Sequence, residues 1–420
     1  MVINRKGETN ILLSSMPVAR TRINLFDVLI YIQVFLCFST LLSGLSSLFS
    51  VVNRILFGVY IVLLLLVIIN YFKKSNFSST AILLLTFFVT IIGMALTLPS
   101  FYSFNDVVYL PLWCLNLVLA SLCYTDVKIS LLKNHSFLFG TAVIWIIIVF
   151  FSLFFPGSYL NHSTGTYFVS FSGQQHRFSQ TGLFIFSCLF IEYLITRNKY
   201  IFLLLILPIF TIFICGARAY LVVILMMAIF LLFISIKNKV GKLLLLVISG
   251  FLVVYAGYYV TISRFYTDSY YYIVNSTSLL NFITSGRTTF WKIDLEHFFN
   301  GSILNIVFGN GYNFVYDTNE QFYGSKLWAH NDYIQVLLAN GFVGLLVYFW
   351  SFFFFLKIVL KKTKAHPVSI LFFLIIIGFN AMFNMVYTYA IANVSTPIIG
   401  VIMLDFSNNM KQTKSFIGFK

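Results

Sequence analysis

Runs of about 20 consecutive apolar residues recur along this chain, and each run is long enough to cross the hydrocarbon core of a bilayer. Sixty per cent of the 420 residues are hydrophobic and only 9% are charged, whereas about 25% of the residues in a soluble domain are charged. A transmembrane β-barrel would alternate polar and apolar residues, and these runs do not alternate. The sequence therefore predicts an all-α, polytopic membrane helical bundle, with residues 1–420 as a single integral membrane domain.

The apolar runs predict twelve transmembrane helices, separated by short connections and a few longer ones. The predicted spans are 24–46, 54–72, 80–98, 106–123, 136–155, 179–196, 199–216, 219–236, 241–262, 329–356, 367–386 and 389–405.

Lysine and arginine in the connections give the orientation, because they are enriched in cytoplasmic loops. With the N-terminus in the cytoplasm, 20 of the 27 basic residues fall inside. We therefore predict that both termini are cytoplasmic. The net charge of +15 follows from this topology and from anionic lipid, and no basic region has the interleaved aromatics suited to nucleic acid. The seven outer basic residues are Arg54, Arg177, Arg218, Arg264, Arg287, Lys292 and Lys326.

The longest outer connection covers residues 263–328 and is too long to be a simple link between helices. Its stretch "SGRTTFWKIDLEHFF" predicts an amphipathic helix with Ser285 as its N-cap. We expect this helix to lie on the membrane surface over the outer face, with Asp294 and Glu296 only decorating it. The residues expected on its apolar side are Phe290, Trp291, Leu295 and Phe298.

Three of the outer arginines stand at expected helix starts. Arg177 precedes a span, Arg218 lies in a very short turn, and Arg287 opens the amphipathic helix. A cation at a helix N-terminus is disfavoured by the helix dipole, but a bound anion reverses the sign. Guanidinium groups and backbone N–H groups together make a phosphate site. Alternatively, each arginine only reaches toward headgroups or pairs with a carboxylate.

The stretch "WAHNDYIQVLLANGFVGLL", residues 328–346, places polar residues at the start of an apolar helix. On a continuous helix His330 and Gly341 lie within about 20° of the same direction, with Gly344 nearby. Small residues allow close helix packing, so this face is expected to point into the bundle.

A histidine at a helix N-terminus is biased toward its neutral form and can accept a proton. His330 is therefore a candidate general base. The alternative is that His330, Asn331 and Asp332 only cap the helix, since Asn and Asp are favoured there.

The pattern His-Asn, nine residues, Gly-x-x-Gly, after an outer loop with "SGRTTFW" and "FGNGYNF", resembles the O-antigen polymerase and O-antigen ligase superfamily. These are bacterial inner-membrane glycosyltransferases. Arg177 and Arg218 stand where the family carries outer arginines. Many members continue with a Gly and an Asn-rich stretch after the first arginine, whereas this chain reads "FSQTGLF", which weakens that correspondence.

The resemblance implies a glycan on undecaprenyl pyrophosphate as donor, used at the periplasmic face without a metal or other cofactor. It implies His330 as the base, with Arg218 and Arg287 stabilising the leaving pyrophosphate. It also implies membrane lipids, a chain-length regulator and a flippase as partners. The implied contacts to pyrophosphate or glycan are Arg177, Arg218, Arg287, Asn331 and Asp332.

Three functions remain open on the sequence. The leading hypothesis is a polymerase that joins repeat units, and the sister hypothesis is the ligase that transfers polymer to lipid A–core. A flippase would need charges along a path open to both sides, and here the unusual charges collect on one side. Sugar-stacking aromatics are candidates in "TDSYYYIVN" and "NEQFYGSKLW", with an interfacial aromatic belt as the alternative.

Overall fold

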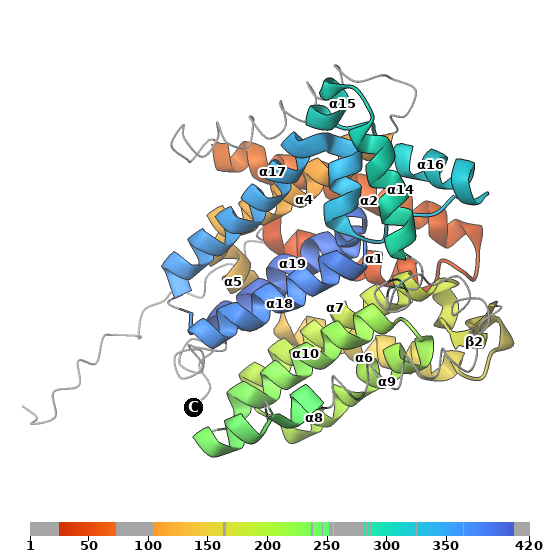
Figure 1. Ribbon diagram of the computed structural model, residues 1–420. Helices are drawn as coiled ribbons and strands as arrows, with labels where there is room; N and C mark the ends of the chain where they lie inside the picture. The colour runs from red at the N-terminus through yellow and green to blue at the C-terminus, as the bar shows by residue number, and fades with distance from the viewer. Residues whose placement is uncertain are drawn as a thin grey trace, which may run out of the picture.

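The computed structural model describes most of the chain as helix, with one short β-hairpin (Figure 1). The predicted span 80–98, the stretch "TDSYYYIVN", the expected cap Ser285 and most of residues 252–286 lie outside the described residues. The described residues are 25–72, 104–162, 165–236, 238–245, 247–251, 287–324, 326–363 and 365–406, with positions 255, 281 and 284.

Up to residue 235, the described residues form nine α-helices and the hairpin. A left-handed Arg197 separates α7 from α8, and a left-handed Gly216 separates α9 from α10. These elements are α1 (Leu25–Leu41), α2 (Ser47–Phe72), α4 (Phe104–Leu122), α5 (Tyr124–Lys133), α6 (His135–Ser152), β1 (Tyr159–His162), β2 (Gly165–Phe168), α7 (Gln175–Thr196), α8 (Lys199–Leu204), α9 (Ile206–Cys215) and α10 (Arg218–Ser235).

The second part begins with three short helices from the long connection and ends with three helices of the bundle. β1 and β2 of the first part pair antiparallel, with Tyr159 opposite Phe168. The second-part helices are α14 (Arg287–Phe299), α15 (Ile303–Phe308), α16 (Phe314–Tyr323), α17 (Asp332–Thr363), α18 (Pro367–Phe383) and α19 (Ala390–Val401).

Five described helices, α2, α6, α7, α10 and α17, are long and apolar enough to cross a membrane. A sixth results if α4 and α5, which meet at 86°, form one broken span. The prediction of twelve spans is not confirmed, because several apolar runs form shorter helices. Arg54, predicted in an outer connection, lies inside α2. The shorter helices correspond to the predicted spans 24–46, 199–216, 367–386 and 389–405.

Helix α7 is the centre of the bundle, and almost all its side chains are buried. In Figure 1 it runs beside α10, which in turn runs beside α18. Gln180 of α7 donates to the Tyr220 hydroxyl of α10 at 3.0 Å, and Trp145 of α6 donates to Thr181 at 3.1 Å. These buried bonds fix the packing of α7 against both neighbours, since breaking one leaves an unpaired polar group.

Ion pairs hold the end of the bundle that lies away from α14 and the hairpin. Lys133 pairs with the buried Asp27 of α1 at 2.8 Å, and Lys128 pairs with the buried Asp405 at 2.6 Å. These pairs satisfy acidic groups that apolar surroundings would otherwise destabilise. The hairpin, α14–α16 and the starts of α7, α10 and α17 gather at the opposite end.

Candidate functional site

His330 lies outside the helix that the sequence assigned to it. Helix α17 begins at Asp332, and the backbone of His330 has φ +50°. This left-handed conformation costs a non-glycine residue on the order of 1–2 kcal/mol. Asn331 caps α17, because its Oδ1 accepts the backbone N–H of Ile334 at 3.1 Å. The strained turn directs His330 away from the helix axis.

Asp332 does not cap the helix, so its expected capping role is wrong. Its side chain is fully buried, and Oδ2 accepts the hydroxyl of Tyr348 at 3.0 Å and the backbone N–H of Tyr387 at 3.4 Å. Tyr348 lies farther along α17, and Tyr387 lies between α18 and α19. Asp332 therefore ties α17 to the α18–α19 connection rather than reaching an open site.

The helical arithmetic that placed His330 and Gly341 on one face is also wrong. Gly341 has φ +66° and ψ −170°, so α17 is broken there. Just before the break, the carbonyls of Leu338 and Ala339 accept hydrogen bonds from the N–H groups of Asn310 and Gly311 at 2.9 Å each. The motif "FGNGYNF" therefore donates hydrogen bonds to the carbonyls at the break in α17.

Gly344 lies where α17 faces α4. It is buried, and a Cβ at this position would lie 3.3 Å from Leu110 of α4. Because a small residue lets two helices approach closely, Gly344 permits the packing of α17 on α4.

The ring of His330 stacks on the ring of His176 in the first turn of α7, with centroids 5.2 Å apart and planes at 26°. The other neighbour of His176 is Tyr220 of α10, in an edge contact at 5.8 Å. Both histidines are half-buried. Sequence reasoning missed His176, although the run "QQHR" at the head of an apolar span was a signal.

Arg287 opens α14, as predicted, and lies near His330. Its Nη1 donates to the carbonyl of Phe383, the last residue of α18, at 2.9 Å. Burial lowers the pKa of His330 well below its usual range, and the charges of Arg287 and His176 lower it further. His330 is therefore neutral at pH 7 and able to accept a proton.

Arg177 and Arg218 lie in the first turns of α7 and α10, so three of the helices at this end begin beside an arginine. Gln175 donates to the carbonyl of Cys215 at 2.8 Å, which joins the start of α7 to the end of α9. Arg177 Nη1 reaches the Ser43 hydroxyl at 3.5 Å. Arg287 is the arginine whose charge acts on both His176 and His330.

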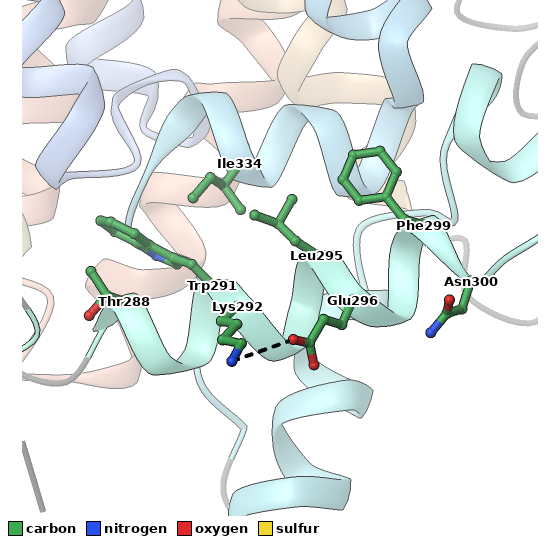
Figure 2. Close-up of a pocket in the computed structure, with 8 residues that line it drawn as sticks. All are labelled: Thr288, Trp291, Lys292, Leu295, Glu296, Phe299, Asn300 and Ile334. Carbon is green, nitrogen blue, oxygen red and sulfur yellow. Dashed lines mark ion pairs between the residues drawn. The ribbon is translucent and has the colours of Figure 1, made fainter. Parts of the chain in front are cut away.

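Helix α14 packs on α17 rather than standing alone, and its amphipathic character stays a prediction, because the residues it buries are the acidic Asp294 and the apolar Phe298. Phe298 is buried, and Trp291 Nε1 donates to the carbonyl of Ala329, directly before His330, at 2.6 Å. A pocket of about 550 Å³ lies between Trp291, Leu295 and Ile334, and Figure 2 shows the side chains that line it. The solvent side carries the exposed ion pair of Lys292 and Glu296 at 3.8 Å.

Asp294 does not decorate the surface of α14, contrary to expectation. It is fully buried, and Asn319 of α16 donates to its Oδ2 at 3.4 Å. Burial raises its pKa to about 7. The sequence placed it two residues from the exposed Glu296, and only the position of α16 explains why one acid is buried and the other is not.

Aromatic rings lie between the start of α16 and α4, and Trp328 contacts two of them. Trp328, the last residue of "NEQFYGSKLW", makes edge contacts with Tyr316 at 4.6 Å and Tyr312 at 4.9 Å. Tyr312 also packs on Tyr109 of α4 at 5.3 Å. These contacts show an aromatic cluster, and its sugar-binding role stays a prediction. The described part of the chain contains no group of three His, Cys, Asp or Glu residues that would hold a metal ion, and metal independence also stays a prediction.

The fold and site define a class: a helical protein with apolar helices fit for a membrane and a cationic, histidine-containing site at one end of the bundle. Residues 203–349 match the family model described as O-antigen ligase. This match bears out the resemblance to the O-antigen polymerase and ligase superfamily over residues 203–349. No curated protein matches the chain. The match includes Arg218, Arg287 and His330, whereas His176 and Arg177 precede it.

Proposed function

We propose that the protein is a polysaccharide polymerase that uses a glycan on undecaprenyl pyrophosphate as donor. The observation that carries this proposal is the position of His330, which is held neutral beside Arg287 and stacked on His176. A neutral base next to fixed cations suits a reaction in which a hydroxyl loses its proton while an anion departs.

The reaction follows from these charges. The acceptor sugar's hydroxyl oxygen bonds to the anomeric carbon of the donor's reducing-end sugar, and the hydroxyl proton passes to His330. The bond between that carbon and the pyrophosphate oxygen breaks, and its electron pair leaves with undecaprenyl pyrophosphate. Arg287, Arg218 and Arg177 stabilise the negative charge that develops on the leaving group.

The helix starts support an anion at this place. Helices α7, α10 and α14 each present N-terminal N–H groups beside an arginine. The helix dipole disfavours these cations when the site is empty, and a bound pyrophosphate makes both interactions favourable. Asn331 and Asp332 contribute to the site by shaping the turn of His330 and the start of α17.

The proposal includes the location. Residues 1–420 form one domain in the bacterial inner membrane, both termini are cytoplasmic, and the site with the 263–328 connection faces the periplasm. The clustering of the hairpin and α14–α16 at one end of the bundle supports this orientation. The proposed partners are the lipid-linked oligosaccharide, membrane lipids, a flippase and a chain-length regulator.

A deletion strain tests the reaction. Loss of a polymerase leaves single repeat units on lipid A–core, which an electrophoretic ladder shows as one short band. A strain that still makes long chains contradicts the proposal. Polymerisation by purified protein in detergent, where there is no membrane to cross, excludes a flippase.

The ligase is the second candidate, and the description of the matched family model favours it. Loss of a ligase leaves long chains attached to undecaprenyl pyrophosphate and none on lipid A–core. The same strain therefore separates the two enzymes, since the carrier of the remaining glycan differs.

A further inference from the structure

The site contains a second histidine, and its contacts differ from those of an ordinary core residue. His176 stacks on His330 at 5.2 Å and makes a T-shaped contact with Tyr220 at 5.8 Å. These two contacts link α10, α7 and the turn before α17. Neither histidine ring has a hydrogen bond within the part of the chain that the structure describes.

The backbone around His330 does little to fix the orientation of its side chain, because the residue lies outside a helix. It lies in a turn between α16 and α17, at φ +50°. A catalytic imidazole is usually oriented by a hydrogen bond at its second nitrogen. Within the described residues His330 has none, so its orientation depends on ring contacts.

The opposite partner is rigid. His176 lies in the first turn of α7, whose side chains are almost all buried. Gln175 bonds the Cys215 carbonyl at 2.8 Å, and Gln180 bonds Tyr220 at 3.0 Å, so α7 is fixed to α9 and α10. A flat ring on this helix provides a fixed surface for the ring of His330, which lies outside a helix.

We propose that His176 is the positioning residue of the site, whose flat face orients the His330 imidazole toward the acceptor hydroxyl. This inference rests on the proposed glycosyl transfer. His176 contributes the plane of its ring and takes no proton. It couples the bundle, through α7, to the segment that carries the base.

Two substitutions of similar size test the proposal. His176→Phe keeps a flat ring, whereas His176→Leu fills the space without one. We expect His176→Leu to lower kcat about 10–100-fold with little change in KM for the lipid-linked donor. His176→Phe should retain most of the activity. The measurement is the initial rate of glycan transfer by purified full-length protein at saturating and subsaturating donor.

His297→Leu is the matched control, because this exposed histidine also packs on an aromatic ring, Phe322 at 4.8 Å, but does not touch His330. It should keep the wild-type rate. Equal activity of His176→Leu and wild type overturns the proposal, and so does an equal loss in the Phe and Leu variants. If wild-type protein transfers no glycan at all, the proposed function fails instead.

Discussion

Gly309 and Gly341 lie against each other's backbone segments. A Cβ on Gly309 would meet the carbonyl oxygen of Ala339 at 2.2 Å, and one on Gly341 would meet the carbonyl oxygen of Val307 at 2.3 Å. Both residues have positive φ, 92° and 66°. The close approach allows "FGNGYNF" to donate its N–H groups to the broken turn of α17. This contact holds the first half of α17, which follows His330 in the chain, against α14 and α15.

Gly341→Ala and Gly309→Ala should each prevent correct folding. Each adds a methyl group where backbone atoms already stand, and backbone cannot move as a side chain can. Gly324→Ala is the matched control, because Gly324 has φ +66° with nothing within 4 Å of its Cβ position. It should cost only about 1 kcal/mol. Thermal unfolding in detergent measures all three, and three equal losses would show that only φ matters.

His330→Ala should lower the rate of glycan transfer by about 10²–10⁴-fold, as expected for loss of a general base. The protein should insert and fold normally, because the ring is only half-buried and alanine, which also carries a Cβ, leaves the cost of the left-handed backbone about unchanged. His366→Ala, at the start of α18, is a histidine control that should keep its activity. Full activity in His330→Ala with normal membrane levels would exclude His330 as the base.

Arg287→Ala should reduce transfer strongly, because it removes a cation beside the leaving pyrophosphate. Lys292→Ala, one turn farther along α14, removes an exposed cation whose ion pair with Glu296 contributes little. A rate that falls in the first variant and not in the second supports a specific anion site. Equal small effects in both would indicate that only the general positive field of α14 matters.

Asp332→Ala should destabilise the fold by about 1–3 kcal/mol, because it leaves the buried hydroxyl of Tyr348 and the N–H of Tyr387 without an acceptor. Asn331→Ala should cost about 1 kcal/mol, the usual loss of a helix cap. A double-mutant cycle of Asp332→Ala with Tyr348→Phe should show coupling. Strict additivity in that cycle would show that the two side chains do not interact.

Asp294 should make stability depend on pH. In the unfolded chain it titrates near about 3.9, and burial raises its pKa to about 7 in the folded protein. Between these values the folded state binds the extra proton, so the free energy of unfolding falls as the pH rises and levels off above the folded pKa. The stability of Asp294→Asn should therefore exceed that of wild type more at pH 8 than at pH 4.5.

Glu296→Gln, on the same helix but exposed, should show no such pH-dependent difference in melting temperature. A constant offset between Asp294→Asn and wild type at both pH values would mean that the carboxyl group is charged, or neutral, throughout.

Local properties of the sequence determined the class of fold and many of the functional candidates. Apolar runs require helices in a bilayer, so the helical class and most helix positions followed. Arg177, Arg218 and Arg287 were correctly placed at helix starts, because charge and turn residues mark those boundaries.

Tertiary contacts decided the rest. The apolar periodicity predicted a continuous helix from His330 to Gly341. Instead, the segment around Gly309 packs against α17 and supplies hydrogen bonds that stabilise a break at Gly341. The burial of Asp294 depends on α16, and that of Asp332 on the α18–α19 connection. His176 meets His330 from 154 positions earlier in the chain. Such pairings depend on which helices pack together, and the local sequence pattern of either segment does not reveal its partner.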